Sequence, residues 1–139
     1  MLAQVVQTVE GGLYRLGRKI WKDDPLIELR EQADRLSDEL RRRYAALERL
    51  RAEREEVAQR LADHEINAAM LVSRIETYVH IGDSAGAWRH ALELDQVRRE
   101  MKRDRARLGQ CEERCRRQRA HVRQVEGELA DLLDQLYPR

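Results

Sequence analysis

Residues 25–50 read PLIELREQADRLSDELRRRYAALERL, and this stretch opens the apolar repeat that decides the fold. Alternating steps of three and four residues run from Leu26 to Tyr78 without a break, and 13 of the 16 positions that they reach are apolar. A 3.5-residue repeat sustained over this length is typical of a coiled-coil seam, not of the face of a globular helix. The sequence therefore predicts one helix over residues 25–81, roughly 80 Å long at 1.5 Å per residue.

The second half of the chain carries a matching repeat. The same steps run from Ala87 to Leu136, and 12 of these 15 positions are apolar. We call the positions reached by the two repeats seam positions. Between the repeats lies Gly82-Asp83-Ser84-Ala85-Gly86, where Gly can end one helix and Asp or Ser can cap the next. A connection this short makes consecutive helices antiparallel. We therefore predict an all-α, two-helix coiled-coil hairpin over residues 25–139, with a helix at 25–81, a turn at 82–86 and a helix at 87–137.

The composition agrees with a coiled coil and excludes several other classes. The chain of 139 residues has 38% charged residues and no Phe, and its 27 basic residues nearly cancel its 26 acidic ones. The net charge of +1 therefore does not indicate an acidic or a basic partner. Two cysteines are too few for a secreted disulfide scaffold, and no apolar run approaches the roughly 18 residues needed to span a bilayer. We expect a cytoplasmic protein with reduced thiols.

Residues 1–24 form a separate predicted segment, a short amphipathic helix that ends at Asp23-Asp24-Pro25. Apolar residues at steps of three and four, with Lys and Arg on the polar side, are typical of a helix that lies in a membrane interface and is attracted to anionic headgroups. A helix packed on the hairpin, or a dimer contact, is the alternative. The predicted membrane-binding residues are Leu2, Val5, Val6, Val9, Leu13, Leu16, Ile20, Trp21, Arg15, Arg18, Lys19 and Lys22.

Near the predicted turn, several apolar residues lie off the seam. Two helices cannot bury a second apolar row, and an exposed row usually marks self-association or a partner site. The residues assigned to this assembly or partner contact are Ile66, Met70, Val72, Trp88 and Leu92; Val79 also lies off the seam.

Reactive residue types occur at seam positions and are interpreted as structural. Cys111 and Cys115 fall on the seam, where a free Cys packs as a small hydrophobe, and no quartet with zinc spacing accompanies them. A turn centred near residue 83 brings together positions that sum to about 166–168, which places His64 near Asp104 as a polar layer that fixes register. No nucleophile accompanies this His–Asp pair, and the sequence contains no phosphate loop or catalytic triad. We therefore expect no catalytic residue, metal, cofactor or enzyme activity.

The stretch 98–119 holds ten basic residues and four acidic ones. A basic face can bind nucleic acid through phosphate contacts, but this stretch lacks interleaved aromatic residues and any known binding motif. Residues 47–68, which would face it, are enriched in Glu and Asp. We therefore expect much of this charge to pair across the hairpin, and nucleic acid is not an expected partner.

The order of these parts resembles the phage-shock protein A family, relatives of the ESCRT-III membrane-remodelling proteins. The resemblance is carried by Lys22-Asp23-Asp24-Pro25, by Leu29-Arg30, and by Gly82-Asp83-Ser84-Ala85-Gly86-Ala87-Trp88-Arg89-His90-Ala91-Leu92-Glu93 at the turn. Members of that family usually continue past the hairpin with further helices. This chain ends at Tyr137-Pro138-Arg139, so the resemblance is to a short form that lacks them.

The resemblance implies peripheral binding to the inner face of the cytoplasmic membrane, through the first helix and anionic lipid. It also implies a homo-oligomer that supports membrane integrity or a stress response, and a partner that is an AAA+ regulator or a full-length relative. The alternative is a soluble coiled-coil adaptor or regulatory protein that binds a protein partner, with the N-terminal helix packed on the hairpin.

Overall fold

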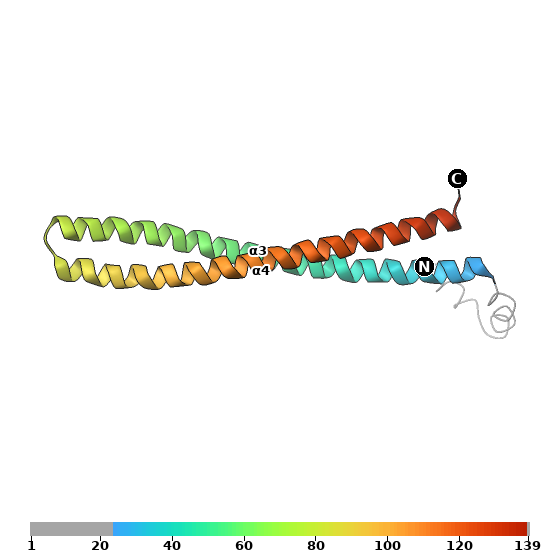
Figure 1. Cartoon of the computed structure of the whole chain (residues 1–139), viewed down its shortest axis with the longest axis horizontal. Helices are drawn as coiled ribbons and strands as arrows, with labels where there is room; N and C mark the ends of the chain where they lie inside the picture. The colour runs from blue at the N-terminus through green and yellow to red at the C-terminus, as the bar shows by residue number, and fades with distance from the viewer. Residues whose placement is uncertain (1–23, 139) are drawn as a thin grey trace. The chain divides into compact units, whose positions relative to one another are not determined.

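The computed structural model describes residues 24–138, and over these residues the chain forms two α-helices. Helix α3 spans Pro25–His80, and helix α4 spans Ser84–Leu136 (Figure 1). The two helices pack against each other, and the described residues contain no strand. These observations confirm the predicted all-α hairpin. The short helix predicted for residues 1–24 falls on residues that the structure does not describe.

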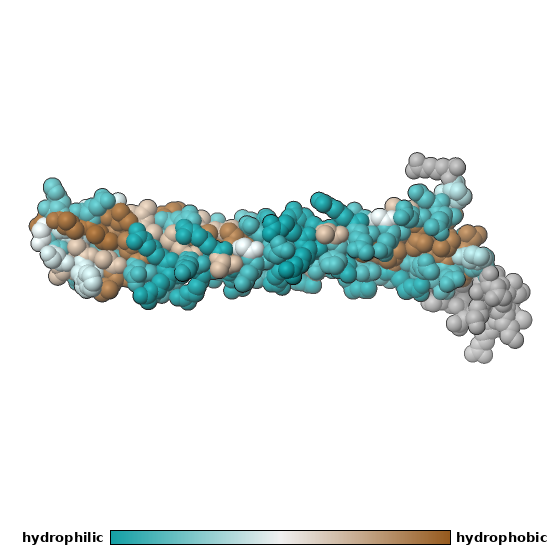
Figure 2. Space-filling model, in the orientation of Figure 1, coloured by the Kyte–Doolittle hydropathy of each residue, from teal (hydrophilic) through white to brown (hydrophobic). Residues whose placement is uncertain are grey.

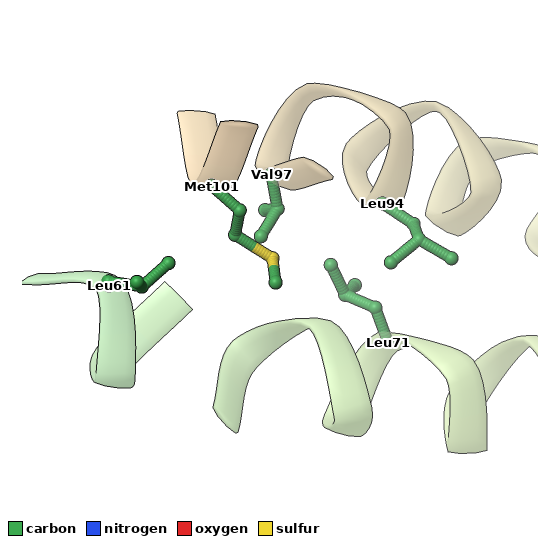
Figure 3. Packing of buried hydrophobic residues seen from close by; sticks show 5 residues of the cluster. All are labelled: Leu61, Leu71, Leu94, Val97 and Met101. Carbon is green, nitrogen blue, oxygen red and sulfur yellow. The ribbon is translucent and has the colours of Figure 1, made fainter. Parts of the chain in front are cut away.

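The hairpin divides into two units, each built from parts of both helices. The turn unit is Glu48–Arg116, and the terminal unit comprises the described residues of Met1–Leu47 and Arg117–Arg139. The turn unit holds a core cluster in which Leu71 of α3 faces Leu94 and Val97 of α4 (Figure 3). The terminal unit buries a smaller set, Ala33, Leu47, Val122 and Val125.

The buried hydrophobic side chains follow the seam. All 13 of those in the described residues occupy seam positions. Because a 3.5-residue repeat keeps one stripe of each helix facing the other, the periodicity alone selects them. Asp104, the buried charged residue, is also a seam position.

Helix α3 begins and ends with recognisable caps. The Asp24 carboxylate accepts a hydrogen bond from the Leu26 N–H at 2.9 Å, and Pro25 occupies the first helical position. At the other end Gly82 has a φ of 79°, a conformation that glycine adopts without strain. The Asp83 N–H donates to the Tyr78 carbonyl at 2.9 Å and the Gly82 N–H to the Val79 carbonyl at 3.1 Å. This pair of bonds is a Schellman motif, which satisfies carbonyls at the end of the helix.

The second helix starts three residues earlier than predicted. Helix α4 begins at Ser84, not at residue 87, because the Asp83 carboxylate accepts a hydrogen bond from the Gly86 N–H at 3.0 Å and so caps the helix. The turn is therefore shorter than 82–86. The remaining predicted helix ends, residues 81 and 137, differ from His80 and Leu136 by one residue each.

Gly86 lies inside α4, where it touches the other helix. A Cβ atom built there would lie 2.6 Å from Cδ1 of Tyr78, which is too close for any side chain. The Tyr78 ring in turn packs edge-on against His90, with ring centroids 5.0 Å apart. The glycine is therefore required by close packing next to the turn.

Candidate assembly surface

Large apolar side chains are exposed around the turn. Ile66, Met70, Trp88 and Leu92 are 62%, 50%, 66% and 54% exposed, and brown surface gathers over the turn in Figure 2. Val79 and Ile81 are exposed as well. We define the turn surface as Ile66, Met70, Val79, Ile81, Trp88 and Leu92.

Two residues differ from the expectation for this surface. Val72 was assigned to the assembly contact, but it is half-buried and packs against the core cluster of the turn unit. Ile81 is predicted as the last residue of the first helix and is not assigned to the surface, but it is 65% exposed. Its signal in the sequence is its position off the seam, between the seam residue Tyr78 and Gly82.

Two grooves hollow the turn unit beside these exposed side chains. One, of about 300 Å³, lies next to Trp88 and Val79, and its remaining lining residues are Ile75, Gly82, Ser84, Ala87 and Ala91. The other, of about 570 Å³, lies next to Ile81, and its remaining lining residues are Ser73, Arg74, Thr77, Tyr78 and His90. Protruding apolar side chains therefore stand directly beside depressions that a second apolar surface can fill.

The seam of the turn unit contains the predicted polar layer. The Nδ1 atom of His64 lies 2.9 Å from Oδ2 of Asp104, and its Nε2 atom lies 3.1 Å from Oε2 of Glu100. The Arg60 guanidinium lies 3.7 Å from the other oxygen of Asp104. The buried carboxylate is thus held between a ring nitrogen and a cation, and none of the grooves described here is lined by His64 or Asp104.

The two cysteines pack in the seam, as expected. Cys111 and Cys115 are free thiols that are 1% and 2% exposed. Burial raises the pKa of the Cys111 thiol, and the nearby Glu53 carboxylate adds to this effect. A thiol held in its neutral form is a poor nucleophile, so its role here is packing.

The basic stretch 98–119 is paired in part across the hairpin. Arg107 and Arg114 lie 3.2 Å and 3.7 Å from the two carboxylate oxygens of Glu53, and Arg105 lies 3.8 Å from Glu65. Both acids belong to the stretch that was expected to face the basic one. These contacts are exposed, so each stabilises the hairpin by at most about 1 kcal/mol.

The terminal unit contains a third groove, of about 580 Å³. Its floor includes the seam residues Leu36 and Leu132, both half-buried. Its other lining residues are Gln32, Arg35, Glu39, Glu128, Asp131 and Gln135. Three carboxylates against one guanidinium make the groove acidic.

In the same unit the Tyr44 hydroxyl donates a hydrogen bond to Glu126, and this bond raises the pKa of Tyr44.

The predicted membrane-binding residues, from Leu2 to Lys22, lie outside the described residues. Within the described part, neither helix has a stretch apolar and long enough to cross a bilayer. In that same part of the chain, no group of three His, Cys, Asp or Glu side chains is arranged to hold a metal ion.

Comparison of the chain with protein-family models, with curated proteins and with solved structures finds no match.

Proposed function

We propose that this chain is a helical-hairpin assembly protein that associates with itself through the turn surface and is held at a membrane by residues 1–24. The observation that carries the first part is the concentration of exposed large apolar side chains at one end of the hairpin. The buried hydrophobic side chains of the turn unit, by contrast, all follow the seam. An apolar surface that two helices cannot cover favours association with another apolar surface.

A second copy of the same chain is the proposed occupant of the turn surface. Trp88 and the groove beside it belong to one surface, so a two-fold axis would bring each Trp88 to the groove of the other hairpin. Aromatic anchors of this kind account for much of the binding energy in interfaces. The small residues Ala87 and Ala91, which line the groove, would allow the helices to approach closely.

The double substitution W88A/L92A should weaken self-association by about 100-fold or more, because each side chain is a large apolar contact at the centre of the proposed interface. Sedimentation equilibrium over a range of protein concentrations measures the dissociation constant. The matched control is L133A/Y137A, which also truncates one Leu and one aromatic residue that are exposed, in the terminal unit. A wild-type chain that stays monomeric, or equal dissociation constants for the two variants, would contradict the proposal.

The membrane part of the proposal rests on the sequence of residues 1–24 and on the resemblance to the phage-shock protein A family. The proposed location is the inner face of the cytoplasmic membrane, where assembled hairpins would support membrane integrity or a stress response. In that setting an AAA+ regulator or a full-length relative is a further proposed partner. Anionic headgroups attract Arg15, Arg18, Lys19 and Lys22, while the apolar stripe enters the interface.

Removing residues 1–24 should abolish co-sedimentation with anionic vesicles while leaving the hairpin folded, because the adsorbing segment lies wholly within those residues. Residues 25–139 and the intact chain are compared at equal concentration, and circular dichroism verifies the helix content of both. Vesicles of neutral lipid serve as the control for charge. Equal binding of the two forms to anionic vesicles would overturn the membrane proposal.

The second candidate is a soluble adaptor in which residues 1–24 pack on the hairpin and the turn surface binds another protein. The acidic groove of the terminal unit favours this candidate, since it offers a docking place for a basic amphipathic segment. The two candidates differ in what residues 1–24 contact when lipid is absent.

A further inference from the structure

We propose that the groove of the terminal unit binds the chain's own residues 11–18, and that anionic lipid competes with the groove for this segment. The inference rests on the proposed function, in which residues 1–24 adsorb to anionic membrane. It adds a binding site for that segment and a way of regulating its release.

The seam of the terminal unit is incompletely covered by its own two helices. Leu47 is buried, but the unit's leucines at positions 29, 36, 40, 129, 132 and 136 are half-buried, and Leu26 is exposed. In the turn unit, by contrast, the seam residues Leu50, Leu61, Leu71 and Leu94 are buried, and Leu108 is the one seam leucine that is half-buried. Leu36 and Leu132 both line the groove, so its floor is apolar and accessible. Apolar side chains from a third segment would remove this surface from water.

The charges around the groove match the segment. Glu128 and Asp131 are exposed, and neither carboxylate forms an ion pair with another described residue. Glu39 adds a third carboxylate, which is paired with Arg43 at 3.0 Å, and Arg35 is the one cation in the lining. The segment 11–18 reads GGLYRLGR, with two arginines and no acid.

The length of chain before α3 brings this segment to the groove. The α3 residues that line the groove run from Gln32 to Glu39. Counted along the chain, residues 11–18 precede Pro25 by the same distance at which residues 32–39 follow it. A helix that folds back antiparallel at Asp23-Asp24-Pro25 would therefore carry residues 11–18 alongside the groove. Leu13 and Leu16 would face the floor, and the positive charge of Arg15 and Arg18, on the other side of the segment, would be attracted to Glu128 and Asp131 at longer range.

The consequence is a competition between two acidic surfaces for one basic amphipathic segment. The residues that would fill the groove are those that would enter the membrane interface, so one segment cannot do both. Docking reduces the fraction of chains competent to bind lipid and thereby weakens the apparent affinity for membrane. The groove would thus hold the hairpin off the membrane until anionic lipid is abundant.

The test uses the full chain and the variant E128Q/D131N, which removes the two unpaired carboxylates. Its matched control is E55Q/E56Q, two exposed carboxylates of the turn unit, which changes the net charge by the same amount. Without lipid, amide hydrogen exchange in residues 11–18 should be slow in the wild type and about fivefold faster in E128Q/D131N. In the control the exchange rate should match the wild type.

A second measurement follows co-sedimentation with vesicles of phosphatidylglycerol and phosphatidylcholine. E128Q/D131N should reach half-binding at about fivefold less lipid than E55Q/E56Q, because release from the groove restores the binding-competent fraction. Unprotected residues 11–18 in the wild type, or identical exchange in all three chains, would overturn the docking. If exchange responds as expected but no chain binds vesicles, docking of residues 11–18 in the groove is supported and the proposed membrane function is wrong. Equal lipid binding by the two variants, with E128Q/D131N faster in exchange, would refute the competition.

Discussion

Leu71→Ala is expected to lower the free energy of unfolding by about 2–5 kcal/mol, the range for removing a well-packed leucine from a core. Leu71 is 2% exposed and faces Leu94 and Val97 across the seam of the turn unit (Figure 3). The substitution removes apolar contacts from both helices, and the helical backbone cannot move in to fill the space. Urea denaturation followed by circular dichroism, at a fixed protein concentration, measures the loss.

Leu133→Ala is the matched control for that experiment, because it removes the same side-chain atoms at a position outside the turn surface. Leu133 is 42% exposed, and Ala has a slightly higher helix propensity than Leu. Its effect on the free energy of unfolding should stay within about 0.5 kcal/mol. Comparable losses for the two substitutions would contradict the packing of α3 through its seam.

The core of the hairpin was predictable from the sequence because its geometry is periodic. Each helix presents one stripe to the other, and the 3.5-residue repeat identifies that stripe without any knowledge of distances. The same arithmetic about a turn near residue 83 placed His64 opposite Asp104, and their side chains lie 2.9 Å apart. Cys111 and Cys115 were assigned to packing for the same reason, and both are buried.

The end of the turn was not predictable to the residue, because capping depends on local competition. Asp83 and Ser84 are both suitable caps, and Gly86 reads as part of a turn. In the structure Asp83 caps α4, and Gly86 is a helical residue that lies against Tyr78. Glycine is required there because the two helices approach each other closely at Gly86 and Tyr78. The residue pattern of a single helix carries no information about that distance.

The candidate sites were predictable only where they follow from the helical repeat. Exposure of Ile66, Trp88 and Leu92 follows from their positions off the seam. The groove of the terminal unit has no such signal, because Leu36 and Leu132 occupy seam positions just as Leu61 and Leu94 do. The repeat is the same in both units, yet the leucines are covered to different extents, so the repeat alone does not predict their burial.

His64→Leu alone is expected to lower the free energy of unfolding by about 2–3 kcal/mol, whereas H64L/D104L should restore it to the wild-type value or above. Asp104 is a buried carboxylate, and without His64 its nearest cation is Arg60, at 3.7 Å and half exposed. A buried charge that loses its partner cannot recover its hydration. Replacing both residues with leucine removes the charge and extends the apolar seam.

The two single substitutions, the double substitution and the wild type form a thermodynamic cycle measured by urea denaturation. Asp104→Leu alone should cost less than His64→Leu, because His64 is less buried and keeps its contact with Glu100 at 3.1 Å. A coupling energy of about 1 kcal/mol or more would show that the pair acts as one unit. Additive effects would instead mean that the layer does not stabilise the seam through this contact. If the double variant is as stable as expected, the pair adds little net stability, and its contribution is to select the register in which α3 and α4 meet.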